Sequence, residues 1–349
     1  MTQEEHIQPT RPAPPRVRRG AAVPLTGLSG RTVALLGYGN QGRAHALNLR
    51  DSGVEIRVGA REGVGALTAR QDGFETMSLD EATKEADLVI IALPDETQPD
   101  LFEENIRPNL TPGATIGFLH GFAIHHDMLE VPEGIGVVMI APKGPGVTLR
   151  DRFVEGGGIP CLLSVHTESA RGDAETLALG WAAGLGCGRA AVLDTTFANE
   201  TETDLFGEQV ILCGGLNALV IAAYETLVDA GYPPELAYIE CCHEVKQVAD
   251  LIQERGLAGM RAAISNTAEF GAYEAMKIMD DDGLRTKFAT MLENIRNGAF
   301  ATRMVEDHRA GGDAMNEARQ HSAAHPIEET GRFVRSLMAP LDDKTPEDH

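Results

Sequence analysis

Four carboxylate side chains in the second half of the chain have a spacing that could bind metal ions. Asp204 and Glu208 are four residues apart, and Glu240 and Glu244 repeat that spacing. Residues four apart share one face of a helix, where like charges repel each other. Both pairs border strongly apolar sequence, and burial would add to the repulsion. One or two Mg²⁺, which prefer oxygen ligands, would remove that cost; the alternative is a solvated acidic face.

A glycine-rich motif near the N-terminus could bind a dinucleotide. The motif consists of Gly37, Tyr38, Gly39, Asn40, Gln41 and Gly42. It follows a predicted strand over residues 32–36 and begins a predicted helix that ends near residue 51. In that context the first glycine makes a tight turn, the second lets a pyrophosphate approach the backbone, and the third lets the helix pack on the strand. Free N–H groups at the helix N-terminus can bind phosphate; the alternative is a structural turn without a ligand.

The second predicted strand covers residues 55–58. The residues that follow it indicate which dinucleotide the protein binds. NAD sites usually place Asp or Glu at that strand end, where it binds the ribose 2′-OH. This chain has no acid there, and Arg61 follows instead. A basic side chain favours the 2′-phosphate of NADPH. The neighbouring Glu62 is an acid close to the same position, so NADH binding remains possible. Alternatively, Arg61 is a solvated loop residue that contacts no cofactor.

The order of the predicted elements defines the fold class. Apolar runs between residues 32 and 193 are continuous rather than alternating, as in parallel strands covered on both faces. Helical stretches separate them, which predicts an α/β Rossmann domain with a doubly wound, mainly parallel sheet. After about residue 197 only helices are predicted. The predicted parts are a disordered tail (1–24), the dinucleotide-binding domain (25–196), an all-helical domain (197–340) and a flexible tail (341–349).

Charge and composition narrow the function classes. The 349 residues include 30 basic and 52 acidic side chains, a net charge of −22. Phosphate backbones and anionic lipid surfaces require clustered Lys and Arg, so we expect neither nucleic acid nor a membrane as partner. The five cysteines form no C-x-x-C motif, which is typical of a reducing compartment and predicts a cytoplasmic protein. The longest nearly apolar run, residues 210–224, is too short to span a bilayer.

Taken together, these segments resemble the ketol-acid reductoisomerases (acetohydroxyacid isomeroreductases) in their short class I form. Two segments are highly specific: A-P-K-G-P-G at residues 141–146 and E-T-E-T-D-L-F-G-E-Q at residues 200–209. The resemblance extends from about residue 30 to residue 338. The other segments that carry it are residues 37–53, 93–96, 120–122, 240–244 and 264–269.

The resemblance implies a fold and an assembly. A Rossmann domain would be followed by an all-helical, knotted domain. Two Mg²⁺ would be held by Asp204 and Glu208 of one chain and by Glu240 and Glu244 of a partner chain. The protein would then be a homodimer or a larger homo-oligomer with shared active sites.

The resemblance also implies a reaction. The small-molecule substrate would be a 2-hydroxy-2-alkyl-3-keto acid of the 2-acetolactate type. Alkyl migration and reduction by NADPH would give a 2,3-dihydroxy acid, as in branched-chain amino acid biosynthesis. Lys143 and His120 would lie between metals and cofactor, and Lys143 is the best candidate for a proton relay. Glu244 would hold the metal or the substrate hydroxyl, and Ser265 would bind the substrate carboxylate.

Two departures from the family pattern leave alternatives open. Val64 and Ala66 stand where relatives place serines near the 2′-phosphate, so we expect a weaker preference for NADPH. Ala262 and Ala263 replace an aromatic residue before the serine motif. One alternative is therefore a paralogue that acts on a different keto acid in specialised metabolism. Another is a non-catalytic Rossmann protein, against which the complete set of candidate site residues argues.

Overall fold

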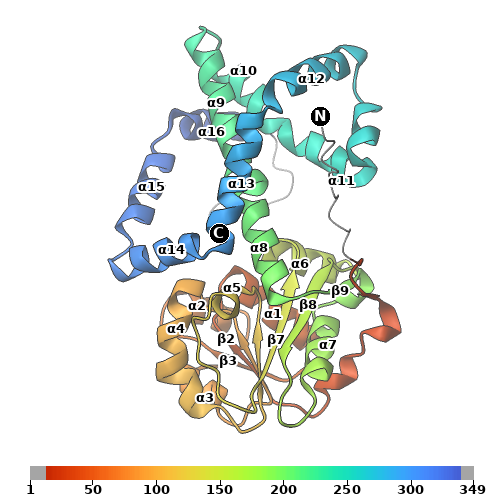
Figure 1. Cartoon of the computed structure of the whole chain (residues 1–349), viewed down its shortest axis with the longest axis vertical. Helices are drawn as coiled ribbons and strands as arrows, with labels where there is room; N and C mark the ends of the chain where they lie inside the picture. The colour runs from red at the N-terminus through yellow and green to blue at the C-terminus, as the bar shows by residue number, and fades with distance from the viewer. Residues whose placement is uncertain (1–12, 339–349) are drawn as a thin grey trace, which may run out of the picture. The chain divides into compact units, whose positions relative to one another are not determined.

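The protein consists of two compact units in a computed structural model, which describes residues 13–338 (Figure 1). The boundary between the units lies between Thr201 and Glu202. The sequence predicted it between residues 196 and 197. The difference arises because helix α8, Phe197–Gly207, continues without a break across both positions. The predicted tail over residues 341–349 lies outside the described residues.

A nine-stranded sheet forms the centre of the first unit. Its strands are β1 (Val17–Arg18), β2 (Val33–Leu36), β3 (Ile56–Gly59), β4 (Thr76–Met77), β5 (Leu88–Ile91), β6 (Thr115–Phe118), β7 (Gly136–Pro142), β8 (Cys161–Thr167) and β9 (Val192–Asp194). Their order is β1-β9-β8-β7-β6-β5-β2-β3-β4. Only the β1–β9 and β7–β8 pairs are antiparallel among these strands. The predicted Rossmann-type, mainly parallel sheet is confirmed.

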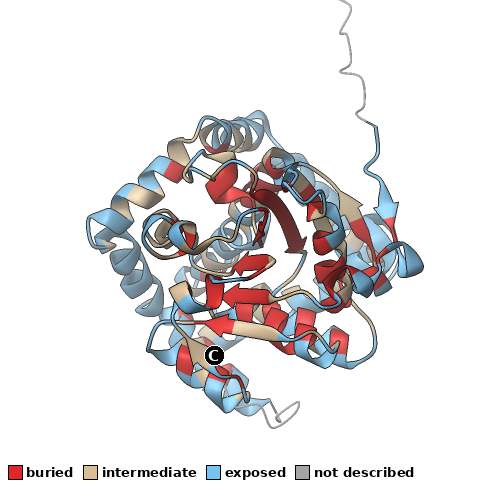
Figure 2. Cartoon of the chain, turned by 90° about the horizontal axis from the view of Figure 1, so that it is seen from below, coloured by how far each residue is buried: buried red, intermediate tan, exposed pale blue. Residues whose placement is uncertain are grey.

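Helices cover both faces of this sheet, which explains the continuous apolar strands. They are α1 (Asn40–Asp51), α2 (Val64–Gln71), α3 (Leu79–Thr83), α4 (Gln98–Leu101), α5 (Phe122–His125), α6 (Gly146–Val154) and α7 (Ala174–Gly184). Neighbouring residues of β2 belong to opposite cores: Leu35 packs in the cluster that contains Trp181 of α7, and Leu36 in the cluster that contains Phe118. Figure 2 shows the buried residues concentrated in the strands and on the helix faces turned toward them.

The N-terminal segment is ordered at the edge of the sheet. β1 pairs with β9, and Val23 is buried. Arg18 is 8% exposed, and its Nη2 lies 2.8 Å from Asp194 Oδ2 and 2.6 Å from Glu175 Oε1. The predicted disordered tail over residues 1–24 is therefore wrong for residues 17–23, because ion pairs with residues distant in sequence hold this segment. Residues 1–12 of that prediction lie outside the described part of the chain.

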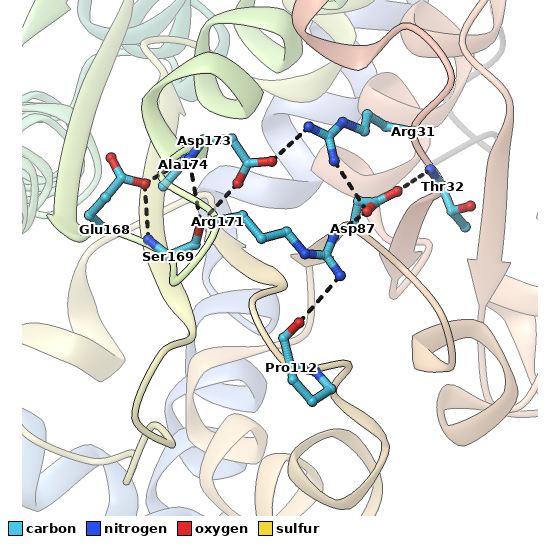
Figure 3. A network of polar contacts seen from close by, with 9 residues as sticks. All are labelled: Arg31, Thr32, Asp87, Pro112, Glu168, Ser169, Arg171, Asp173 and Ala174. Atoms are coloured by element: carbon cyan, nitrogen blue, oxygen red, sulfur yellow. Dashed lines mark hydrogen bonds and ion pairs between the residues drawn. The ribbon is translucent and has the colours of Figure 1, made fainter.

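A polar network joins the N-terminal ends of β2, β5 and α7 (Figure 3). The Asp87 carboxylate accepts hydrogen bonds from Arg31 (3.4 Å), from Arg171 and from the Thr32 backbone N–H (3.0 Å). Arg31 also donates to Asp173 at 2.7 Å. Burial raises the pKa of Asp87, but the Thr32 N–H and the two guanidinium groups outweigh it, so the net shift is downward. This network stabilises the end of the sheet opposite the glycine-rich turn.

Asp87→Ala is expected to lower the free energy of unfolding by about 2 kcal/mol, because its donors lose their acceptor. Folding lowers the pKa of Asp87, so its stabilising effect is present above its unfolded pKa and is lost as pH falls through the lower folded value. Urea unfolding at pH 7 and pH 3 tests this, with exposed Asp151→Ala as the control. A loss of stability equal in the two variants, or greater at pH 3 than at pH 7, would contradict it.

The described part of the second unit is helical throughout, which confirms the predicted all-helical domain. After α8 its helices are α9 (Gly215–Asp229), α10 (Pro234–Tyr238), α11 (Val245–Arg261), α12 (Asn266–Met279), α13 (Asp282–Arg296), α14 (Ala299–Arg309), α15 (Asp313–Ala323) and α16 (Pro326–Leu337). Two π-helical segments, Glu208–Leu212 and Ile239–His243, connect α8 with α9 and α10 with α11. The knot that the family resemblance implies stays a prediction.

Candidate active site

The glycine-rich turn between β2 and α1 has the geometry of a phosphate-binding turn. Gly37 has φ +100°, and a Cβ there would lie 2.4 Å from the Ala92 carbonyl oxygen. A Cβ on Gly42 would lie 2.4 Å from the Gly37 oxygen, so helix and strand pack at backbone distance. A Cβ on Gly39 would meet no atom within 4 Å. The turn therefore leaves space in front of the N-terminus of α1, where a pyrophosphate can reach the free N–H groups.

Tyr38 supports this turn rather than facing a ligand with its side chain. It is 6% exposed, and its ring packs edge-on against Phe74. Its hydroxyl donates to Asp72 Oδ2 at 2.9 Å, and the same carboxylate accepts from Arg43 Nε at 2.7 Å. Burial, and then Asp72, raise the pKa of Tyr38. Among the predicted cofactor residues, Tyr38 therefore offers a ligand only its backbone.

The loop after β3 presents Arg61 to solvent, whereas the neighbouring acid is paired. Arg61 and Glu62 are both exposed. Glu62 forms an ion pair with Arg70, in which Nη1 lies 3.2 Å from Oε2, and this pair lowers the pKa of Glu62. Val64 is 82% exposed at the start of α2, but Ala66 is fully buried. A hydroxyl at position 66 would thus face the core, and only position 64 could present one to a cofactor.

Glu200 connects the two predicted catalytic residues of the first unit. Its side chain is 1% exposed, and Oε1 accepts a hydrogen bond from Lys143 Nζ at 2.7 Å. Its Oε2 accepts from the Gly121 N–H at 2.8 Å and lies 2.9 Å from His120 Nδ1. His120 follows β6 and Lys143 follows β7, both at the edge of the sheet where the glycine-rich turn follows β2. Ligands of open α/β sheets bind at this edge.

The electrostatics of this cluster favour an ionised Glu200. Burial raises the pKa of Glu200, but hydrogen bonds and charge interactions with His120 and Lys143 lower it to about 2. Gly121 has no room for a side chain, because a Cβ would lie 2.4 Å from Thr201 Oγ1. Glu200 was not predicted as a site residue. The sequence contains one indication of its role. Glu200 precedes Asp204 by four residues, the same spacing that separates Asp204 from Glu208.

Asp95 is a second titratable residue that the sequence analysis did not assign. It follows β5, and its Oδ1 accepts from Gln98 Nε2 at 2.9 Å. Burial raises the pKa of Asp95 to about 6, and the charge of His120 opposes the rise. A carboxyl group that titrates near neutral pH at the ligand-binding edge of a sheet is typical of a functional site.

The four predicted metal ligands form two pairs, and each pair lies at or beside a π-helical segment. Asp204 follows Glu200 by one turn of α8, and Glu208 begins a π-helical segment. Glu240 lies within the other π-helical segment, and Glu244 follows it directly. Such π-bulges occur frequently at functional sites. Glu208, Glu240 and Glu244 are exposed in the single chain, so the burial that would favour a metal requires another surface to cover them.

Ser265 is exposed at the N-terminus of α12. Its Oγ accepts a hydrogen bond from the Ala268 N–H at 3.2 Å and caps the helix. The hydroxyl hydrogen remains able to donate. A helix N-terminus with a serine cap favours a carboxylate ligand, which is compatible with the predicted substrate contact.

Many large apolar side chains of the second unit are exposed in the single chain, among them Ile211, Leu212 and Leu219. Its buried hydrophobic cluster comprises Tyr224, Ala237, Tyr238, Ile327 and Val334, and Figure 1 shows its helices spread out rather than gathered into one bundle. The helical stretch from Phe197 to Asp229 is 33 residues long and has an 18-residue window of mean hydropathy 1.7 that is 11% buried. By length and composition it could cross a membrane, unlike the shorter run seen in the sequence. Alternatively, another protein surface covers the apolar side chains of this helix.

Comparisons with known proteins extend over both units. Residues 27–191 match the family model for the acetohydroxy acid isomeroreductase NADPH-binding domain, and residues 197–340 match that for the ketol-acid reductoisomerase C-terminal domain. The chain is 45% identical over 315 residues to a ketol-acid reductoisomerase (NADP(+)) of Leptospira biflexa, which covers 89% of the chain and 94% of that relative.

Two solved structures place this similarity in three dimensions. An NADH-preferring ketol-acid reductoisomerase from an uncultured archean is 38% identical, with a TM-score of 0.90 over 93% of this chain and 99% of its own. A semialdehyde dehydrogenase NAD-binding protein from Cupriavidus necator is 20% identical, with a TM-score of 0.59 over 76% of this chain and 99% of its own. The second likeness shows the fold alone.

Proposed function

Because the chain belongs to the ketol-acid reductoisomerase family, we propose which of its residues perform the steps of that family's reaction. The function is that of an NADP-dependent ketol-acid reductoisomerase in branched-chain amino acid biosynthesis. A 2-hydroxy-2-alkyl-3-keto acid of the 2-acetolactate type undergoes alkyl migration, and NADPH reduces the new 2-keto group. The observation that carries the assignment of residues is the Lys143–Glu200–His120 cluster at the ligand-binding edge of the sheet.

Lys143 is the proposed proton relay, and Glu200 is the group that holds it. The ammonium group of Lys143 carries three N–H donors, one of which donates to Glu200, and an ammonium group can transfer a proton to a substrate oxygen. Glu200 is almost fully buried and ionised, which fixes the position of Lys143 and of His120 Nδ1. Ser265, at the N-terminus of α12, would bind the substrate carboxylate.

Asp204 and Glu208 of one chain, with Glu240 and Glu244 of a second chain, would hold two Mg²⁺. Four carboxylates are the oxygen donors that Mg²⁺ prefers, and both pairs lie at π-helical segments. When bound, the metals would polarise the substrate carbonyl and lower the pKa of its hydroxyl. Glu244 would contact a metal or that hydroxyl.

The protein is proposed to be a homodimer or a larger homo-oligomer of the cytoplasm. Three of the proposed ligands are exposed, and the helix that carries Asp204 and Glu208 continues into the apolar, poorly buried stretch. A second copy that covered this surface would bury both the apolar side chains and the carboxylates. Biosynthesis of amino acids from small keto acids requires no membrane, which supports this explanation of the apolar helix over a bilayer.

Arg61→Ala is expected to weaken NADPH binding about tenfold and to leave NADH binding nearly unchanged. The guanidinium would pair with the 2′-phosphate, which NADH lacks, whereas the phosphate-binding turn is common to both cofactors. Steady-state kinetics with each cofactor measure this. The control is Arg57→Ala on β3, a half-buried arginine that donates to the Lys84 carbonyl oxygen at 2.7 Å. A wild-type specificity constant higher for NADH than for NADPH would overturn the preference, and equal losses for both cofactors in Arg61→Ala would overturn the role.

The function is tested by NADPH oxidation with 2-acetolactate, with Mg²⁺ and with excess EDTA. We expect turnover that requires Mg²⁺. 3-Hydroxypyruvate serves as a second substrate that tests reduction without alkyl migration. Failure to turn over 2-acetolactate while another keto acid is converted would favour the paralogue, and Mg²⁺ binding without turnover of any keto acid would favour a non-catalytic protein.

A further inference from the structure

The side chain of Gln41 connects the phosphate-binding turn with the turn that carries Lys143. Gln41 is the second residue of α1, within the glycine-rich motif. Its Nε2 donates a hydrogen bond to the Gly144 carbonyl oxygen at 3.0 Å. Gly144 follows Lys143 in the turn between β7 and α6. The amide thus spans 103 residues of sequence to reach the residue next to the proposed proton relay.

The two turns are also packed at backbone distance. A Cβ on Gly146 would lie 2.1 Å from the Asn40 carbonyl oxygen and 3.2 Å from the Gln41 nitrogen. The Lys143 N–H donates to the Pro160 oxygen at 2.9 Å. The backbone around Lys143 is therefore held on one side by Pro160, the residue before β8, and on the other side by Gln41. A shift of the phosphate-binding turn has to shift Gly144 or break its hydrogen bond to Gln41.

An amide at position 41 is a poor choice for stability alone. Its Oε1 is enclosed and has no hydrogen-bond partner among the described residues. A buried acceptor without a donor destabilises the folded state, and an unbranched apolar side chain of similar volume would avoid that loss. Local conflicts of this kind are expected where function requires them. What the amide provides in return is a single donor directed at Gly144.

We propose that Gln41 is a positioning residue that couples occupancy of the dinucleotide turn to the placement of Lys143. Binding of the pyrophosphate at the N-terminus of α1 restrains Gln41, and through Gly144 it restrains the backbone that carries the lysine. The ammonium group is then held between this backbone and Glu200, 2.7 Å from Nζ. The inference rests on the proposed function, because it takes Lys143 as the proton relay.

Gln41→Met tests the coupling, because Met keeps the length of the side chain and removes only the donor and the enclosed acceptor. We expect kcat on 2-acetolactate to fall about tenfold, since small misplacements of a reacting group are costly. The KM for NADPH should stay within about twofold, because backbone N–H groups bind the phosphates. The melting temperature should be unchanged or higher. A parallel fall of kcat and melting temperature would indicate a merely structural role and overturn the proposal.

Two control variants separate coupling from packing. Asn48 also connects α1 with α6. It donates to the Leu149 oxygen at 3.4 Å and accepts from Arg150 at 2.9 Å, and both partners lie in α6 beyond the turn that carries Lys143. Asn48→Ala should lower the melting temperature while kcat stays within about twofold. Gln71→Met, at an exposed position of α2, should change neither quantity. A tenfold loss of kcat in Asn48→Ala would assign the effect to general packing.

Hydrogen–deuterium exchange tests the coupling without catalysis. In the wild type, NADPH should slow exchange in residues 37–42 and in residues 143–150. In Gln41→Met it should slow exchange only in residues 37–42, and residues 143–150 should exchange several-fold faster than in the wild type even without cofactor. Equal exchange of residues 143–150 in both proteins would overturn the coupling. A wild type inactive on 2-acetolactate would refute the proposed function, while the cofactor-free exchange rates would still decide the coupling.

Discussion

Glu200→Gln is expected to lower kcat by about a hundred- to a thousandfold, which lies within the range of about 10² to 10⁴ that positioned acid–base groups contribute. The substitution removes the buried negative charge that holds Lys143 at 2.7 Å and His120 at 2.9 Å. A neutral amide cannot balance the ammonium charge, and its NH₂ group would meet another donor on one side. Steady-state kinetics with 2-acetolactate measure the effect. NADPH binding, followed by cofactor fluorescence, should change little, because the glycine-rich turn is intact.

Glu155→Gln is the matched control for this variant, because Glu155 is a 60% exposed glutamate paired with Arg152 at the end of α6. It should retain full activity. Folding lowers the pKa of Glu200 from 4.5 to about 2, so its ionised form contributes stability above pH 4.5. That contribution is lost as pH falls toward 2, and Glu200→Gln should therefore lose less stability relative to the wild type in acid than at pH 7. Activity within about threefold of the wild type would show that Glu200 does not hold the relay.

Glu240→Gln is expected to abolish Mg²⁺-dependent turnover, with a loss of more than about a thousandfold, and to leave NADPH binding nearly intact. One neutralised ligand weakens a site that depends on four negative charges. The dinucleotide turn lies in the other unit of the chain, so Mg²⁺ binding should be lost while NADPH binding is kept. Calorimetric titration with Mg²⁺ and fluorescence titration with NADPH measure them independently.

The control for this variant is Glu235→Gln, an exposed glutamate in the first turn of α10. It changes the same charge on the preceding helix and should bind Mg²⁺ as the wild type does. Normal turnover of Glu240→Gln would remove Glu240 from the metal site. Loss of NADPH binding together with Mg²⁺ binding would indicate that the substitution disturbs the fold instead.

Local sequence was sufficient where short segments determine the geometry. The glycine-rich turn is such a case, because Gly37, Gly39 and Gly42 each have one steric task that depends on neighbours within the strand–turn–helix unit. Continuous apolar strands likewise predicted a sheet covered on both faces. The family itself was recognisable from short acidic and glycine-rich segments. The finer roles of its residues, including the metal ligands and Ser265, stay predictions.

Contacts between distant segments account for what the sequence did not predict. Arg18 is ordered by Asp194, 176 residues away, and an N-terminal stretch rich in proline and arginine gives no sign of that partner. Glu200 acquires its role only when the ends of β6 and β7 place His120 and Lys143 beside it. Tyr38 lies inside a cofactor motif, yet Asp72 and Phe74 hold its side chain in the core.

The surroundings of the four predicted metal ligands could not be predicted from one sequence. A spacing of four predicted a shared helical face for each pair, but it could not show that both pairs lie at π-helical segments or that three of the four side chains are exposed. The sharing of one metal site by two chains is therefore the central claim to be tested.

Mixing two inactive variants tests this claim most directly. Chains with Glu240→Gln and chains with Asp204→Asn are unfolded together, refolded at equal concentrations and assayed with 2-acetolactate, NADPH and Mg²⁺. If each site takes Asp204 from one chain and Glu240 from the other, half of the dimers are mixed and each has one intact site. Activity should then return to about a quarter of the wild-type value, as two-fold symmetry requires. No recovery in the mixture, with wild-type chains refolding normally under the same treatment, would contradict sharing of the site.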